Sequence, residues 1–104
     1  MRYRVTRDAA GELDEIFSYW AKRVSVETAE RVINGIIKHF PLIADYPDTG
    51  RSTDNITPGV RCFPAGKYLI YFRKTNDGIQ ILHIIHGARN QLTAFHAPKG
   101  QEYE

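Results

Sequence analysis

Apolar residues in the first part of the chain recur at intervals of three and four, which is the spacing of one face of an α-helix. Within residues 9–23 this stripe consists of Ala10, Leu13, Ile16, Phe17 and Trp20. The charged positions between them are expected to face water, namely Glu12, Asp14, Glu15 and Lys22. Thr6 or Asp8 can cap a helix that begins here. The pattern predicts an amphipathic helix that ends near Arg23.

A second helix is predicted to begin at Ser25, with Glu27 in its first turn to complement the helix dipole. Its apolar stripe consists of Ala29, Val32, Ile33, Ile36, Ile37, Phe40 and Ile43. Pro41 should kink or end the helix, because proline cannot donate the backbone hydrogen bond. The turn between the two helices is as short as residues 24–25, so the helices must form an antiparallel hairpin.

The remaining segments read as strands. Residues 2–6 alternate polar and apolar side chains, with Tyr3 and Val5 on one face, and predict a short first strand. Residues 51–58 predict an exposed loop, and residues 59–63, 66–75 and 79–86 predict a three-stranded antiparallel meander. The turn at residues 76–78 contains an Asp-Gly pair that suits the positive backbone angles of a tight hairpin. The fold class is therefore α+β, with one domain in residues 1–96 and a frayed tail in residues 97–104.

The hairpin strands are apolar on both faces, whereas a sheet with one wet face should alternate. On strict alternation Tyr68, Ile70 and Phe72 oppose Leu69 and Tyr71, and Ile79, Ile81 and Ile85 oppose Leu82 and Ile84. The helical hairpin can cover one face only, so the other face needs a partner. The candidate contacts with a protein partner are Tyr19, Leu69, Tyr71, Leu82 and Ile84. Residues 92–95 folding back, or self-association, are the alternative covers.

Composition narrows the class of protein. The chain has 104 residues, 42% of them hydrophobic, and a net charge of +2, which is weak evidence for nucleic-acid binding. No direct sequence-specific nucleic-acid contact is expected. No apolar run is long enough for a membrane span or a secretory signal. Cys62 is the single cysteine, which rules out an internal disulfide and suits a reducing compartment. We expect a cytoplasmic protein.

Basic residues mark the ends of the predicted strands. The candidates for polar contacts with a target are Arg61, Arg73, His86 and Arg89. Arg61 can equally form a structural ion pair with Asp14 or Glu15, and Arg89 can be an ordinary surface arginine.

The histidine and cysteine residues do not predict a metal site. His83 and His86 are three apart on a strand, so they fall on opposite faces, and no metal or cofactor is expected. His86 is expected to order the turn at Gly87, and Arg61 could lower the pKa of Cys62.

Several segments in order resemble the ParE branch of the ParE/RelE toxin family. Residues 9–10 and 13–17, with Tyr19 and Trp20, are similar to the first helix of that branch. Residues 42–47 followed by Gly50 and Arg51 are similar to its "L-x-x-x-P-x-x-G-R" segment, with one residue more between Leu and Pro. Residues 58–61, 66–72 and 81–87 resemble its sheet. The resemblance covers residues 2–90.

The resemblance implies the toxin of a type II toxin–antitoxin system, neutralised by a ParD-like antitoxin and acting on DNA gyrase by binding, without catalysis. RelE-like relatives instead cleave messenger RNA on the ribosome, using Lys, Arg and a late Tyr or His. This chain has Tyr68 where those relatives tend to carry Arg, and Phe95 as its late aromatic. Arg89 fits, however, His96 could act as a base, and His86 lies near Arg89 in the sequence. An mRNA endonuclease and a non-toxic partner-binding scaffold stay open as alternatives.

Overall fold

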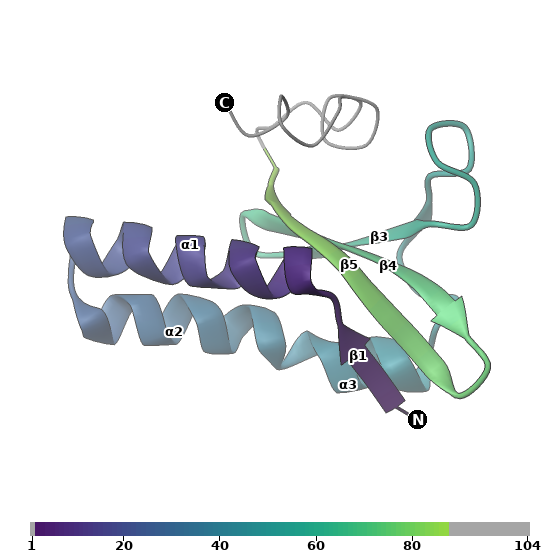
Figure 1. Cartoon of the computed structure of the whole chain (residues 1–104), viewed down its shortest axis with the longest axis horizontal. Coiled ribbons are helices and arrows are strands. Elements are labelled where there is room, and N and C mark those ends of the chain that lie inside the picture. Colours follow the sequence, from purple (N-terminus) through teal and green to yellow (C-terminus); the bar gives the residue numbers. More distant parts are fainter. Residues whose placement is uncertain (1, 88–104) are drawn as a thin grey trace.

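The computed structural model describes residues 2–87. The elements follow in the order β1 (Arg2–Val5), α1 (Arg7–Arg23), α2 (Val26–Ile37), α3 (His39–Asp45), β2 (Arg51–Ser52), β3 (Arg61–Ala65), β4 (Tyr68–Thr75) and β5 (Gly78–His86). The strands form one mixed sheet in the order β1-β5-β4-β3-β2, in which β1 runs parallel to β5 and the other pairs are antiparallel. Figure 1 shows α1 and α2 side by side as the predicted hairpin. The α+β prediction is confirmed.

Both long helices begin where side-chain caps were expected. The Thr6 hydroxyl accepts a hydrogen bond from the Ala9 N–H (3.1 Å), and the Ser25 hydroxyl accepts one from the Thr28 N–H (3.0 Å). The predicted second helix is interrupted between α2 and α3. Pro41 explains the position of the break, because its ring clashes with the carbonyl four residues earlier, and that residue, Ile37, is the last of α2.

The core lies between the helices and one face of the sheet. Its most buried large side chains are those of Ile36, Phe40, Ile43, Ile70, Phe72, Ile79 and Ile81, each at most 2% exposed. A β-bulge at Leu82 then interrupts strict alternation, since Tyr71 pairs with His83 and Phe72 with Ile81. Ile84 therefore returns to the helix-covered face and Ile85 to the opposite face, the reverse of the prediction.

The second face of the sheet carries a small core of its own. Val60, Cys62, Tyr71 and Ile85 are buried there, with Leu69 and Leu82 half-buried around them. The chain covers part of this face itself, because residues 51–58, the segment predicted as an exposed loop, fold back against the buried Val60, where the Thr53 N–H donates to the Val60 carbonyl. That segment also begins as β2 and buries Thr53, whose hydroxyl donates to the Val60 carbonyl (2.7 Å). The prediction of a fully exposed loop is wrong.

The turn between β4 and β5 uses glycine for a different reason than the sequence suggested. Among the described residues only Gly50, Gly59 and Gly66 have positive φ, so the predicted positive angles of the Asp-Gly turn are wrong. A Cβ built on Gly78 would collide with the backbone carbonyl of Arg2. β1 can approach β5 in this register because Gly78 has no side chain.

No helix within residues 2–87 is long and apolar enough to cross a membrane.

Candidate partner-binding groove

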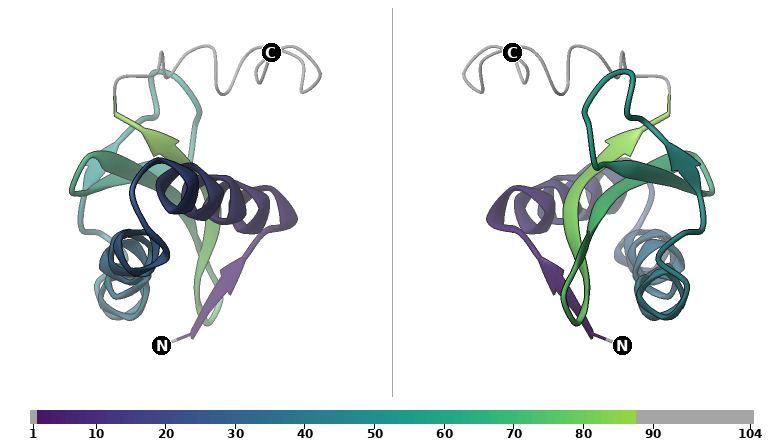
Figure 2. Two further views of the ribbon diagram at one scale, coloured as in Figure 1. Left: turned by 90° about the vertical axis from the view of Figure 1, so that its left-hand side faces the viewer. Right: turned by 90° about the vertical axis from the view of Figure 1, so that its right-hand side faces the viewer.

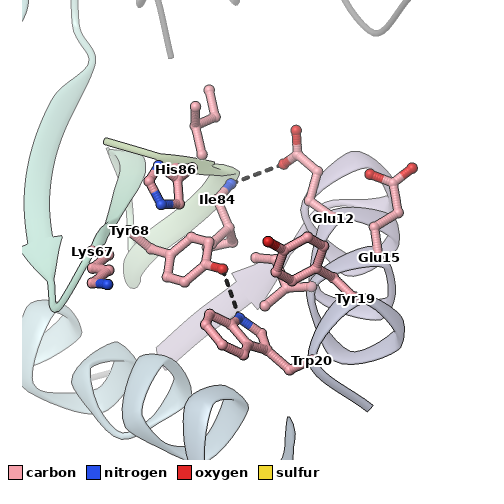
Figure 3. Close-up of a pocket in the computed structure, with 10 residues that line it drawn as sticks. Glu12, Glu15, Tyr19, Trp20, Lys67, Tyr68, Ile84 and His86 are labelled. Carbon is pink, nitrogen blue, oxygen red and sulfur yellow. Dashed lines mark hydrogen bonds between the residues drawn. The ribbon is translucent and has the colours of Figure 1, made fainter. Parts of the chain in front are cut away.

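A groove of about 430 Å³ opens between the later half of α1 and the adjoining ends of β4 and β5 (Figure 3). Its lining residues are Glu12, Glu15, Ile16, Tyr19, Trp20, Lys67, Tyr68, Ile84, Ile85 and His86. Residues from the first and last thirds of the described chain meet here, because α1 packs across β5.

Aromatic side chains form the middle of the groove. The Trp20 Nε1–H donates to the Tyr68 hydroxyl (3.0 Å) across 48 positions of sequence. Tyr19 stands edge-on to Trp20 at 5.3 Å between ring centroids, and the Arg23 guanidinium lies 4.8 Å from the Tyr19 ring centroid. Tyr19 is 49% exposed, although its ring is held from two sides. The groove thus presents an oriented aromatic surface to a ligand.

A second cavity of about 400 Å³ adjoins the first across Trp20, Lys67 and Tyr68. It is lined mainly by α2 and by the turn between β3 and β4, with Arg31 and Lys38 on its helical side. The first cavity has Glu12 and Glu15 on its helical side. We call the two cavities together the Trp20–Tyr68 groove. Its middle, formed by Trp20, Tyr68 and Lys67, lies between an end with Glu12 and Glu15 and an end with Arg31 and Lys38.

Glu12 attaches α1 to β5 at the groove. It is 7% exposed, its Oε1 accepts the Ile84 backbone N–H (2.8 Å), and its Oε2 lies 3.1 Å from His83 Nδ1. The Thr6 hydroxyl donates to the Leu82 carbonyl (3.1 Å) on the same edge of β5. β1 ends at Val5, and beyond that point side chains of α1 and its cap pair with the edge of β5 that β1 leaves open.

The sequence placed Glu12 on the wet face, which is wrong. Ile16 and Trp20 follow Glu12 at intervals of four, so a charged residue stands inside the buried stripe. That spacing is the signal that could have identified it. The start of the predicted stripe is also wrong. Ala10 was assigned to the buried face, whereas Ala9 is buried and Ala10 is exposed.

Arg61 is engaged inside the protein. Its Nε donates to the Thr49 carbonyl (3.0 Å), and its Nη2 donates to the carbonyls of Asp48 (2.8 Å) and Gly50 (3.1 Å). These bonds fasten the loop after α3 to β3. Among the described residues Arg61 forms no ion pair with Asp14 or Glu15, so that alternative is wrong.

The other target-contact candidates are spread over the molecule. Arg73 is exposed and its Nε donates to Gln80 Oε1 (2.8 Å). His86 is exposed at the other end of the hairpin, with its ring edge-on to Tyr68 at 5.3 Å. The Gly87 N–H donates to the Lys67 carbonyl (2.8 Å), so backbone pairing orders that turn. Arg89, His96 and residues 92–95 lie outside the described residues.

The partner-contact candidates divide into two groups. Tyr19 is exposed in the groove, and Leu69 and Leu82 are half-buried on the second face of the sheet. Tyr71 and Ile84 are 1% and 3% exposed, so they offer a partner almost no surface. Sequence reasoning missed Glu15, Lys67 and Tyr68 as lining residues, because their convergence depends on how α1 crosses the sheet.

The Cys62 side chain is buried in the small core on the second face of the sheet. Burial raises the pKa of the Cys62 thiol, and this effect exceeds the opposing effects of the hydrogen bond with Tyr71 and of the charge and hydrogen bond of Arg51. The expected lowering of its pKa by Arg61 is therefore wrong. Within residues 2–87 no three His, Cys, Asp or Glu side chains gather closely enough to hold a metal ion.

Comparison with known proteins identifies the family. Residues 3–91 match the family described as "ParE toxin of type II toxin-antitoxin system, parDE". Toxin ParE1 of Caulobacter vibrioides is 27% identical over 88 residues, which are 85% of this chain and 91% of that protein. Toxin ParE1 of Mycobacterium tuberculosis is 30% identical over 86 residues, 82% of this chain and 88% of that protein.

A solved structure is similar as well. The structure titled "Chromosomal ParDE TA system from P. aeruginosa" has a TM-score of 0.73 and 26% identity, and the likeness covers 83% of this chain and 95% of that one. The order of strand, helical hairpin and antiparallel strands is thus accompanied by sequence similarity over most of both chains. This chain belongs to the ParE toxin family of type II toxin–antitoxin systems.

Proposed function

We propose that the chain poisons DNA gyrase by binding it, without chemistry of its own, and that a cognate ParD-like antitoxin neutralises it by occupying the Trp20–Tyr68 groove. The gyrase target rests on the resemblance to ParE-type toxins. The observation that favours a binding mechanism is the separation of the chain's candidate catalytic groups. Gyrase lies in the cytoplasm, so the proposed site of action is cytoplasmic.

RNA cleavage requires a base near the 2′-hydroxyl and cations at the same phosphate, within hydrogen-bond distance of the reacting atoms. His86 pairs with Tyr68 in the hairpin register, whereas Arg73 stands five positions further along β4. At about 3.3 Å per residue these two groups are roughly 17 Å apart along the strand. The donors of Arg61 are already bonded to loop carbonyls. Arg61, Arg73 and His86 are thus not gathered around one point, which favours binding over catalysis by these groups.

The groove suits a helical segment of an antitoxin. Helix-in-groove recognition uses apolar anchors at helical spacing, and buried aromatic residues commonly supply most of the binding energy. Tyr19, Trp20 and Tyr68 offer the aromatic surface, while Glu15 and Arg31 give the two ends opposite charge. The structure similar to this chain belongs to a ParDE system, which supports an antitoxin as the occupant.

A supercoiling assay with purified gyrase and the purified chain tests the target. We expect loss of supercoiling and accumulation of cleaved DNA. Full supercoiling at saturating toxin would reject gyrase as the target. Cleaved transcripts in a translation extract would favour the endonuclease, and normal growth on expression without an antitoxin would favour the scaffold.

A pair of tyrosine variants tests the groove. Tyr19→Ala should weaken antitoxin binding at least about tenfold, the loss typical of an interface aromatic residue. Tyr46→Ala is the control, because Tyr46, the C-cap residue of α3, is 69% exposed and does not line the groove. Isothermal calorimetry measures both affinities. Equal affinities for the two variants would place the antitoxin elsewhere.

A further inference from the structure

The strand β1 leaves one backbone edge of the sheet without a neighbour. It is one of the two edge strands, with β2 at the opposite edge, and both views in Figure 2 show β1 at the margin of the sheet. The Arg2 N–H donates to the Asp77 carbonyl (3.1 Å) and the Thr6 N–H to the Ile81 carbonyl (3.1 Å). Inward and outward groups alternate in a parallel ladder, so the backbone N–H and C=O groups of Tyr3 and Val5 point away from β5. No described strand pairs with them.

The side chains of β1 present two different faces. Tyr3 and Val5 share one face, where the Tyr3 ring stands edge-on to Phe40 of the core at 5.5 Å. Arg2 and Arg4 share the other face. All four side chains are exposed. A strand laid along this edge would meet apolar groups on one face and cations on the other.

The charges of Arg2 and Arg4 decide between two partners for this edge. One is β1 of a second copy of this chain, and the other is a strand of a different protein. Among the described residues the nearest carboxylate is that of Asp77, 4.0 Å from Arg2 Nε, and Arg4 forms no ion pair. Pairing of β1 with β1 of a second copy would set these arginines against each other, and like charges across a strand pair are destabilising. In many proteins, charged side chains on an edge strand have no role beyond preventing strand pairing. Here Tyr3 and Val5 remain 40% and 37% exposed beside them, which suits an added strand.

We propose that an extended segment of the antitoxin, with acidic and apolar residues in alternation, adds to the free edge of β1 as a further strand. This inference rests on the proposed neutralisation by an antitoxin. Helix α1 starts at Arg7, directly after β1, and its later half lines the Trp20–Tyr68 groove. Its 17 residues span about 25 Å, a distance that an extended chain of roughly eight residues covers. One antitoxin chain can therefore occupy the groove and the edge together, and each contact raises the effective concentration for the other.

Amide hydrogen exchange followed by NMR tests the edge. The samples are the free chain and its complex with the ParD-like antitoxin that restores supercoiling in the gyrase assay. We expect exchange at the Tyr3 and Val5 amides to slow at least about tenfold in the complex, because these N–H groups gain hydrogen bonds. The Thr6 amide is the internal control, since it is already bonded to β5. A complex in which Tyr3 and Val5 exchange as in the free chain overturns the added strand and leaves the antitoxin partnership standing. Failure to form a complex overturns both.

Charge reversal supplies an independent readout. Arg4→Glu should lower the affinity of the complex about tenfold, and the loss should shrink at high salt. Arg7→Glu is the matched control, because Arg7 is exposed and lies just beyond the strand. Both substitutions leave the core untouched, so each variant should fold. Equal losses for the two variants would show a general charge effect and overturn the proposed strand pairing.

Discussion

Replacing Glu12 tests whether α1 is attached to β5 as the structure shows. In Glu12→Ala the Ile84 N–H keeps its buried position and loses its acceptor, and an unsatisfied buried donor costs about 1–3 kcal/mol. Loss of the contact with His83 adds to this, so we expect a total near 2–4 kcal/mol. Glu12→Gln keeps an oxygen that can accept from Ile84 and should cost about 1 kcal/mol.

Urea denaturation at neutral pH, followed by circular dichroism, measures these costs, and a thermal scan should show Glu12→Ala melting roughly 10–20 °C lower. Glu15→Ala is the control on the same helix, because Glu15 is exposed, and it should stay within about 0.5 kcal/mol of the parent. A loss below about 1 kcal/mol for Glu12→Ala, or equal losses for Ala and Gln, would refute the role assigned to the carboxylate.

Three further expectations follow from other parts of the fold. Gly78→Ala should detach β1 and lower stability by at least about 2 kcal/mol in urea denaturation, whereas Gly35→Ala, where an added Cβ meets nothing within 4 Å, should raise it by up to about 1 kcal/mol; similar values for both would contradict the close approach of β1. Because burial raises the pKa of Cys62, its alkylation at pH 8 should be slow in the native chain and fast in urea, and a fast native reaction would count against burial. The hydrogen bond and charge of Lys74 lower the pKa of the Asp48 carboxyl below 3.8, so an NMR titration should show that pKa rising in Lys74→Met. Because the pKa of Asp48 is depressed in the folded state, the contribution of the Asp48–Lys74 pair to folding stability is present above pH 3.8 and is lost as the pH falls below it. An unchanged Asp48 titration in the variant would show that Lys74 does not lower this pKa.

Much of the fold could be predicted because it depends on local signals. The apolar spacing identifies both helices, Thr6 and Ser25 cap them, and Pro41 accounts for the break after Ile37. The two hairpin strands could be predicted from their own apolar residues, without knowledge of what packs against them.

Features that depend on distant contacts were missed or misread. The bulge at Leu82 leaves no mark in composition, yet it exchanges the faces of Ile84 and Ile85. Gly78 resembled a turn glycine, whereas its missing side chain matters because β1 approaches from the other end of the chain. Arg61 carries the same charge in any setting, and only the fold reveals that loop carbonyls occupy its guanidinium.

The candidate site shows the same division. Tyr19 could be identified from its place beside the helical stripe. The groove around it requires the Trp20–Tyr68 contact, which joins positions 48 apart. Glu12 is an intermediate case. Its spacing to Ile16 indicated a buried position, but its charge led to the prediction that it faces water.

Titration of gyrase supercoiling with the purified chain tests the central claim most directly, because a binding inhibitor and a nuclease differ in stoichiometry. The account predicts that inhibition grows with added toxin and saturates near one toxin per binding site on gyrase. Adding the antitoxin in equal amount should restore supercoiling, while transcripts stay intact in a parallel translation reaction. Unimpaired supercoiling at a large excess of toxin, together with transcripts cut by substoichiometric toxin, would contradict it.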